Sequence, residues 1–276
     1  MNSKKRAKEP DAAARGGFFD DLPTLILAVA IALFIRTFAF QSFYVPSDSM
    51  FPTLLIGDHV FVTKLAYGSR VPTTDFRAPG YREPTRGDVV VFQLARGGRK
   101  IYPPDHRPDL PTEAFIKRLV GLPGDRIEVR DGQVWINGQK SDQTATGEKF
   151  TDPSGRVFDV IEEQLGECRH LILDDPRIPA ANMPELRIPT DRFFFLGDNR
   201  DNSYDSRMWG TVGLPNVEGP AGLLYWSWDW TGTWLSLANP LTWWTNLTQK
   251  MRWDRMASMI RCEPPSGEGS RLSLAD

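Results

Sequence analysis

The chain has 276 residues, and its 33 Lys and Arg residues nearly balance its 35 Asp and Glu residues, for a formal charge of −2. This balance leaves no basic surface, which excludes nucleic acid as the main partner. The only two cysteines, Cys168 and Cys262, exclude a disulfide-rich scaffold but leave one bridge open. Three histidines without an HExxH or CxxC motif disfavour a zinc site, and we expect no metal and no cofactor.

The first predicted element is a transmembrane helix over residues 22–40. The stretch is apolar apart from Arg36, and its nineteen residues would extend roughly 28 Å as a helix, enough to cross the hydrocarbon layer. Residues 1–21 form a polar tail in which Lys and Arg outnumber acidic residues. A positive excess before a span places the N-terminus in the cytoplasm, so the rest of the chain would lie outside.

Two other interpretations of this segment stay open. A cleaved secretory signal has the same charged start and apolar core, but Phe38, Phe40 and Phe43 crowd the region where small residues would form the cleavage site. A buried soluble helix is disfavoured because apolar residues surround the helix without leaving a polar face. We favour a single uncleaved anchor.

From Gln41 onward the pattern is typical of short strands separated by Gly and Pro turns. The sequence Asp131-Gly132 predicts a hairpin turn between two of these strands. The expected strands cover residues 88–92, 115–120, 126–130, 133–136, 192–196 and 222–228. The predicted fold class is therefore mainly β, with twisted antiparallel sheets forming an extracytoplasmic domain over residues 41–228 behind the membrane helix.

Two regions differ from this pattern. Residues 141–189 are more polar and predict a small β insertion with strands near 157–161 and 170–173. Most of the nine tryptophans lie from Trp226 onward, which makes residues 229–276 a Trp-rich C-terminal segment. Because Trp favours the headgroup zone, this segment either contacts the membrane surface or forms a helix packed on the sheet. Asn239-Pro240 argues against a second span.

A first polar cluster follows the predicted span closely. Ser47, Asp48 and Ser49 stand between Pro46 and Pro52. Prolines fix φ and hold a turn rigid, which suits an exposed hydroxyl nucleophile. Serines beside prolines also occur in plain turns, so this cluster alone does not define a site.

A second candidate is a lysine inside a predicted strand. Strand alternation places Lys117 on one face with Phe115 and Leu119, and Arg118 on the other face. Keeping a lysine of ordinary pKa neutral at pH 7 costs roughly 5 kcal/mol, and burial lowers that cost. A neutral amine can act as the general base toward a serine. The alternative is an ordinary strand-edge lysine whose amine reaches water.

The third cluster is the polar loop GDNRDNSYDSR at residues 197–207, directly after an apolar strand. It does not match a calcium loop, because the ligand spacing fails and no Gly occupies the sixth position. A solvated turn is the plain interpretation of this loop taken alone.

Taken together and in order, four motifs resemble bacterial type I signal peptidase, a membrane-anchored serine endopeptidase that removes signal peptides from exported proteins. The motifs are Ser-Asp-Ser-Met at 47–50, Gly-Asp-Val-Val-Val-Phe at 87–92, FIKRLVGLPGD at 115–125 and GDNRDNSYDSR at 197–207. The resemblance spans residues 36–228. It implies a Ser/Lys dyad in a mainly β domain, with neither a metal nor a catalytic histidine.

The resemblance also implies a role for each matching residue. Ser49 corresponds to the nucleophile and Lys117 to the general base, acting through an acyl-enzyme. Ser47 would complete the oxyanion hole and Ser203 would orient the amine. Two charged pairs would give structural support, Asp198 with Arg118 and Asp205 with Arg207. The shallow apolar pockets of the family, which accept small residues at positions −3 and −1 of the substrate, would involve Phe43, Val45, Met50, Leu54, Val60 and Ile116.

The chain departs from the family pattern at Asp48, where Gly is most frequent, and this adds a charge beside the nucleophile. The implied partners are signal-peptide-bearing preproteins, the lipid bilayer and, as a candidate, the secretion translocon. The implied location is the bacterial inner membrane, with one span and a periplasmic catalytic domain.

Two rival functions need separate tests. A Ser/His/Asp hydrolase would require a base among His59, His106 and His170, none of which lies in a motif-like setting. A non-catalytic membrane-anchored binding protein could share the fold, but Ser47, Ser49, Lys117 and Ser203 are all intact.

Overall fold

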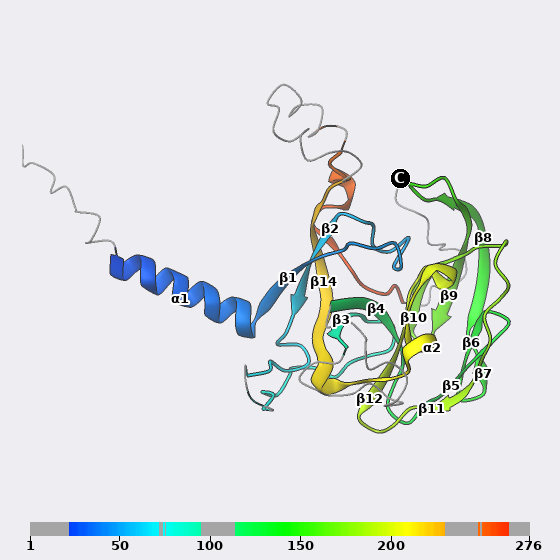
Figure 1. Cartoon of the computed structure of the whole chain (residues 1–276), viewed down its shortest axis with the longest axis horizontal. Helices are drawn as coiled ribbons and strands as arrows, with labels where there is room; N and C mark the ends of the chain where they lie inside the picture. Colours follow the sequence, from blue (N-terminus) through cyan, green and yellow to red (C-terminus); the bar gives the residue numbers. More distant parts are fainter. Residues whose placement is uncertain are drawn as a thin grey trace, which may run out of the picture.

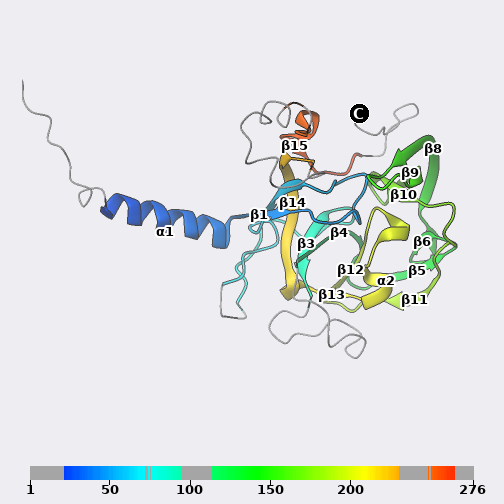
Figure 2. The ribbon, with the colours of Figure 1, turned by 45° about the horizontal axis from the view of Figure 1, so that its top comes forward.

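The computed structural model describes residues 22–71, 74, 76–94, 114–229, 248 and 250–264, and it is mainly β, as the sequence predicts. All strand pairs of its three sheets are antiparallel. The long strand β14 (Val217–Ser227) crosses the centre of the molecule in Figures 1 and 2. The helix α1 (Leu22–Phe38) extends away on one side, and the sheet containing β5 (Arg126–Arg130) lies on the other.

The largest sheet carries the motifs that the sequence singles out. Besides β14, its strands are β1 (Phe40–Tyr44), β2 (Asp58–Thr63), β3 (Val89–Gln93), β4 (Ala114–Gly121), β12 (Arg192–Leu196), β13 (Val212–Gly213) and β15 (Ser258–Met259). They follow the order β1-β2-β14-β3-β4-β12-β13, with β15 on β14. The central strands bury nearly every residue, because apolar clusters cover both faces.

A four-stranded sheet contains the predicted hairpin. The strands β5 and β6 (Gln133–Ile136) have the predicted bounds, and Asp131 and Gly132 between them both adopt positive φ. Beyond β6 lies β7 (Gln139–Lys140), while β11 (Met183–Arg187) pairs with β5. Because β11 belongs to this sheet, the predicted insertion over 141–189 does not form one separate unit.

The third sheet forms most of that insertion. Its strands are β8 (Asp142–Thr151), β9 (Val157–Leu165) and β10 (Cys168–Asp174). Both predicted strands are present but longer than expected. The strand β8 was not predicted, because its sequence DQTATGEKFT is polar and every residue is exposed or half-buried. It is held by its pairing with β9, for instance Phe150 opposite Phe158.

The N-terminal helix is shorter than the prediction over 22–40. It ends at Phe38, and Phe40 already pairs with Thr63 as the first residue of β1. All its residues up to Arg36 are exposed. Within the described residues, no helix combines the length and the apolar character that a membrane span requires. The predicted cytoplasmic tail, residues 1–21, lies outside the described residues.

The described part of the C-terminal segment packs on the sheet. Cys168 and Cys262 form a disulfide, the bridge that the sequence left open, and β15 adds to β14. The buried carboxylate of Asp58 accepts hydrogen bonds from the Ser227 hydroxyl (2.6 Å) and the Arg255 guanidinium (2.7 Å), as well as from the Leu55 backbone N–H (2.8 Å). Tryptophans 230, 234, 243 and 244, for which the sequence predicts either a membrane contact or a packed helix, lie outside the described residues.

Candidate active site

Ser49 lies on the turn between β1 and β2. The Phe51 N–H donates to the Asp48 carbonyl, and the Leu54 N–H donates to the Met50 carbonyl, so backbone bonds close the turn on both sides of the serine. The Asn199 N–H donates to the Ser49 carbonyl over 3.1 Å and ties the turn to the polar loop after β12. Ser49 is 6% exposed, so its hydroxyl is held against the protein rather than in bulk water.

Lys117 reaches this hydroxyl from the neighbouring strand β4. Its Nζ lies 2.5 Å from Ser49 Oγ and 3.1 Å from the Ile116 carbonyl oxygen, and the residue is 3% exposed. Burial lowers the pKa of the amine to about 8, although the charges of Asp205, Asp198 and Asp48 act to raise it. Holding the amine neutral at pH 7 then costs about 1 kcal/mol instead of roughly 5. The buried lysine, not the strand-edge alternative, is what the structure contains.

The turn between β1 and β2, named the nucleophile turn after the role predicted for Ser49, borders two cavities. One of about 530 Å³ is lined in part by Phe51, Leu55 and Ile56, and one of about 490 Å³ opens at Ser49 and Lys117. The latter is lined by Ser47, Asp48, Ser49, Phe115, Lys117, Asp201, Asn202, Ser203, Tyr204 and Met208. Ser47 Oγ is 3.3 Å from Ser49 Oγ, which places a second hydroxyl beside the first. Ser203 lines the same cavity, but its buried hydroxyl has no hydrogen-bond partner, so the contact expected with Lys117 is not made in this structure.

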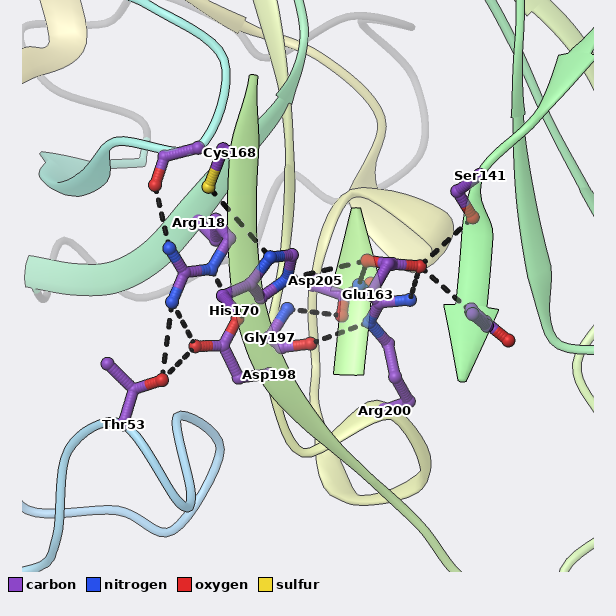
Figure 3. Close-up of polar contacts among 12 residues, drawn as sticks. Thr53, Arg118, Ser141, Glu163, Cys168, His170, Gly197, Asp198, Arg200 and Asp205 are labelled. Carbon is purple, nitrogen blue, oxygen red and sulfur yellow. Dashed lines mark hydrogen bonds and ion pairs between the residues drawn. The ribbon is translucent and has the colours of Figure 1, made fainter. Parts of the chain in front are cut away.

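Arg118, the residue after Lys117 on β4, contacts Asp198, the pair that the resemblance implies (Figure 3). Its Nε and Nη2 donate to the two carboxylate oxygens over 2.7 and 2.6 Å. Asp198 also accepts from the Thr53 hydroxyl at 2.5 Å, which connects the pair to the nucleophile turn. Burial would raise the pKa of the Asp198 carboxyl, but the Arg118 guanidinium outweighs it and holds the pKa below its usual value.

Asp205 and Arg207 also pair, at 2.8 Å, and the pair shapes the loop at the end of β12. The Asp205 side chain caps α2 (Ser206–Trp209) by accepting from the Arg207 N–H, and it also accepts from the Gly197 N–H at 3.0 Å. Gly197 packs against Ser203 and the Ser49 carbonyl so closely that a Cβ would overlap with both. The loop is therefore a structured support for the site and not a solvated turn.

Behind these pairs lies a buried ionic cluster that the sequence analysis missed (Figure 3). Glu163 on β9 pairs with Arg200, whose Nη1 lies 3.0 Å from Glu163 Oε1, and the same oxygen accepts from Ser141. The His170 Nε2 is 3.4 Å from Glu163 Oε2. Arg200 belongs to the 197–207 motif, but its partner is supplied by the insertion, 37 residues earlier. Strict alternation from Phe158 and Val160 would point to Glu162 instead, so no local pattern in β9 singles out Glu163.

The six apolar residues predicted for substrate pockets do lie together. Val45, Met50, Leu54 and Val60 are at most 1% exposed, Ile116 is 9% exposed, and Phe43 packs at the edge of the same cluster. None of the six lines the cavity at Ser49. They form the core under the site, and their predicted contact with substrate stays a prediction.

No described histidine contacts Ser49. His59 lies on β2 beside the rings of Tyr44 and Tyr225, and His170 is buried in the ionic cluster. His106 lies outside the described residues. Among the described residues no group of three His, Cys, Asp or Glu side chains is arranged to hold a metal ion. The base nearest to the Ser49 hydroxyl is therefore the Lys117 amine.

A serine hydroxyl in direct contact with a buried amine of lowered pKa, as Ser49 is with Lys117, is equipped for nucleophilic attack on a carbonyl group. This chemistry defines a class, the serine hydrolases with an amine base. The comparison with known proteins gives the family: residues 19–226 match the model of the family described as signal peptidase, peptidase S26. The chain belongs to this family, and it is a serine endopeptidase of the signal peptidase type, as its motifs predict.

Curated relatives agree with this assignment. The chain is 35% identical to signal peptidase I of Pseudomonas aeruginosa over 82% of its own length and 76% of the relative. It is 32% identical to signal peptidase I of Rickettsia typhi over 82% and 83% of the two chains. A crystal structure of a signal peptidase I from Enterococcus faecalis matches 50% of this chain and 96% of its own, with 25% identity and a TM-score of 0.28.

Proposed function

We propose that this endopeptidase removes N-terminal signal peptides from exported preproteins by acyl transfer, with Ser49 as the nucleophile and Lys117 as the general base. The observation that carries the proposal is the 2.5 Å contact between the buried amine and the serine hydroxyl. The chain belongs to a family of signal peptidases, and among its described residues Ser49 is the serine that contacts a lysine of lowered pKa.

The geometry supports the following reaction. Neutral Lys117 takes the proton of Ser49 as Oγ attacks the carbonyl carbon of the scissile bond. The Ser49 N–H and the Ser47 hydroxyl stabilise the oxyanion, and Lys117 returns the proton to the leaving amine as the peptide C–N bond breaks. Water, deprotonated by the same amine, then attacks the ester carbon. As the bond from that carbon to Ser49 Oγ breaks, Lys117 returns the proton to Oγ, and the signal peptide leaves with a free carboxylate.

The remaining predicted residues support this pair in the proposal. Asp198 links the strand of the base to the nucleophile turn through Arg118 and Thr53. Asp205 and Arg207 hold the loop that carries Ser203, for which we retain the predicted role of orienting the amine once substrate excludes water. We also retain the expected preference for small residues at positions −3 and −1.

We further propose that α1 anchors the protein in the bacterial inner membrane, with the N-terminus in the cytoplasm and the site on the periplasmic side. The exposed apolar surface of α1 and the positive excess before it support this topology. The chain enters β1 directly after the helix, so Ser49 would lie near the bilayer surface where an inserted preprotein presents its cleavage point. The translocon remains a proposed partner.

The decisive experiment is cleavage of a purified preprotein in detergent by the wild type, Ser49→Ala and Lys117→Met. We expect mature protein from the wild type only. Ser258→Ala and Lys140→Met, which alter the same residue types at exposed positions, are the matched controls and should cleave normally. Cleavage by Lys117→Met at the wild-type rate would refute the dyad. A wild type that binds the preprotein without cleaving it would favour the binding-protein alternative.

A further inference from the structure

Asp48 lies between the two serines of the nucleophile turn, and its carboxylate is held from two sides. Asn202 Nδ2 donates to Asp48 Oδ2 over 2.6 Å, and Arg156 Nη2 lies 3.2 Å from the same oxygen. The backbone of Asp48 is held as well, because Asn199 Nδ2 donates to its carbonyl oxygen over 3.1 Å. The side chain borders the cavity at Ser49.

The partners of Asp48 come from two separate parts of the fold. Arg156 is on the tight turn between β8 and β9, where its Nε also binds the buried carboxylate of Asp152 at 2.7 Å. Asn202 ends the 3-10 helix η2 (Arg200–Asn202) in the loop after β12. One carboxylate therefore joins the nucleophile turn, the insertion and the loop that contains Ser203.

The charge of Asp48 also acts on the amine of the base. Three carboxylates raise the pKa of Lys117 against the effect of burial, those of Asp205, Asp198 and Asp48. Asp205 and Asp198 are compensated by arginines with side chains that are 12% and 3% exposed. Asp48 is compensated by Arg156, whose side chain is 39% exposed. The Asp48–Arg156 pair is thus the most exposed of this set, and Asp48 can be altered without removing the partner of a deeply buried arginine. Arg156 keeps a second partner in Asp152, so the folded state of Arg156→Gln is checked by circular dichroism before its titration is compared.

We propose that Asp48 is a positioning residue of the peptidase site. It connects the nucleophile turn to the insertion through Arg156 and to the loop of Ser203 through Asn202, and it places a negative charge in the cavity that Lys117 lines. The inference rests on the proposed roles of Ser49 and Lys117. It makes the insertion, which supplies none of the reacting groups, part of the machinery that fixes the pH range of cleavage. An incidental surface ion pair would have no such effect.

Substitutions of Asp48 and of Arg156 should shift the pH at which Lys117 loses its proton in opposite directions. Asp48→Asn keeps the size and an acceptor for Asn202 but removes the negative charge, so Lys117 loses its proton at lower pH. Arg156→Gln leaves the charge of Asp48 uncompensated, so Lys117 loses its proton at higher pH. A residue with a merely structural role would reduce the rate in both variants without moving the two titrations in opposite directions.

The test uses the full-length protein in detergent with 13C-labelled lysine, so that the titration of Lys117 is followed by NMR independently of cleavage. The same variants are assayed for kcat/KM across pH with a preprotein substrate. We expect the acidic limb of kcat/KM to move to lower pH in Asp48→Asn and to higher pH in Arg156→Gln. The double variant should follow Asp48→Asn, because Arg156 acts through the carboxylate.

Two further variants complete the design. Lys149→Gln removes an exposed cation from the same hairpin, paired with Asp159 instead of Asp48, and should match the wild type. Asp48→Gly removes the hydrogen bonds as well as the charge, and should lower kcat about threefold to tenfold beyond Asp48→Asn, the range expected for a partly exposed charged hydrogen bond. That additional loss separates the tie to Asn202 from the effect of charge.

The outcomes distinguish the two proposals. Shifts of Lys117 in the same direction in both single variants, or no shift in either, would overturn the positioning role even if cleavage is normal. Opposite NMR shifts with no cleavage by the wild type would support the coupling of Asp48 to Lys117 and refute the peptidase mechanism instead. Equal kcat for Asp48→Gly and Asp48→Asn would overturn the tie through Asn202.

Discussion

Lys117 on β4 and Glu163 on β9 are both buried ionisable residues, at 3% and 0% exposure, yet their surroundings differ completely. Glu163 is in contact with Arg200 and His170, and burial, which alone would raise its pKa, is outweighed so that the pKa falls well below the usual value. Lys117 has no carboxylate within ion-pair distance among the described residues, and burial lowers its pKa to about 8. Burial beside charged partners thus keeps Glu163 ionised, whereas burial without a paired carboxylate makes it easier for Lys117 to lose its proton.

The largest effect is expected from replacing Lys117 by a residue that stays positively charged. Lys117→Arg keeps a long cationic side chain, but a guanidinium does not lose its proton in proteins, so no base is available. We expect kcat/KM for preprotein cleavage to fall at least about a thousandfold, within the range that a general base contributes. Circular dichroism should show a folded protein. Activity above a tenth of the wild-type value would mean that a different group accepts the proton.

The second effect tests the compensated side of the comparison. Glu163→Gln leaves Arg200 buried without its carboxylate, and we expect the free energy of unfolding to fall by about 3 kcal/mol. Urea unfolding followed by fluorescence measures this change. Because Glu163 makes no contact with Ser49 or Lys117, the folded variant should still cleave. An unchanged unfolding midpoint would show that Arg200 finds another partner.

The third effect is a gain in stability. The unfolded chain keeps the Lys117 proton up to its ordinary pKa of 10.5, whereas the folded protein releases it near 8. Between these values the unfolded state binds more protons, so the stability of the wild type rises with pH; below pH 8 the cost of the buried cation is present in full. Lys117→Met should therefore be more stable at pH 7 by about 3 kcal/mol, with a gain that shrinks as the pH rises above 8.

Denaturant titrations of Lys117→Met and the wild type at pH 7 and pH 10 measure that difference. A gain of the same size at both pH values would mean that better packing of Met, and not removal of a buried charge, is responsible.

The smallest effect is expected at an exposed pair. Glu128 and Arg130 lie 2.5 Å apart on β5, both in contact with solvent. Arg130→Gln should change neither the unfolding midpoint nor the rate of cleavage beyond experimental scatter, because solvent and salt screen such pairs. A marked loss of stability or of cleavage rate in Arg130→Gln would contradict this expectation, and burial would then not explain why Lys117 and Glu163 differ from exposed charges.

The sequence predicts those parts of the fold and site that depend on local pattern. Alternation over 126–136 defines the β5–β6 hairpin to the residue, and alternation over 115–120 places Lys117 and Arg118 on opposite faces. The strand β8 escapes such analysis, because its pairing with β9 and not its own polar sequence makes it a strand. The end of the helix at Phe38 escapes it too, since apolar Phe40 suits a membrane helix and a strand equally well.

The same distinction applies to the site. Asp198 and Asp205 are found because each lies in a motif that resembles the family, and the resemblance itself implies their partners, Arg118 80 residues earlier and Arg207 in the same loop. Glu163 and Arg156 are not, since each acts on a residue distant in sequence through contacts that only the packed insertion creates. The apolar residues predicted as pockets illustrate the opposite error: hydrophobic residues near a nucleophile are indistinguishable in sequence from the core beneath it.

The anchorage of Asp58 has a consequence for how the protein is made. Asp58 accepts the N–H of Leu55 beside the nucleophile turn, yet the hydroxyl and guanidinium that hold its carboxylate come from Ser227 and Arg255, near the end of the chain. During synthesis the turn is complete long before these residues leave the ribosome. A chain truncated before residue 255 would contain Ser49 and Lys117, but of its two arginine contacts the buried Asp58 would keep only the longer one, with Arg252 at 3.8 Å. We expect such a truncated chain to cleave preprotein less well than the full chain, because the segment under Ser49 would lose the contact of Asp58 with Arg255.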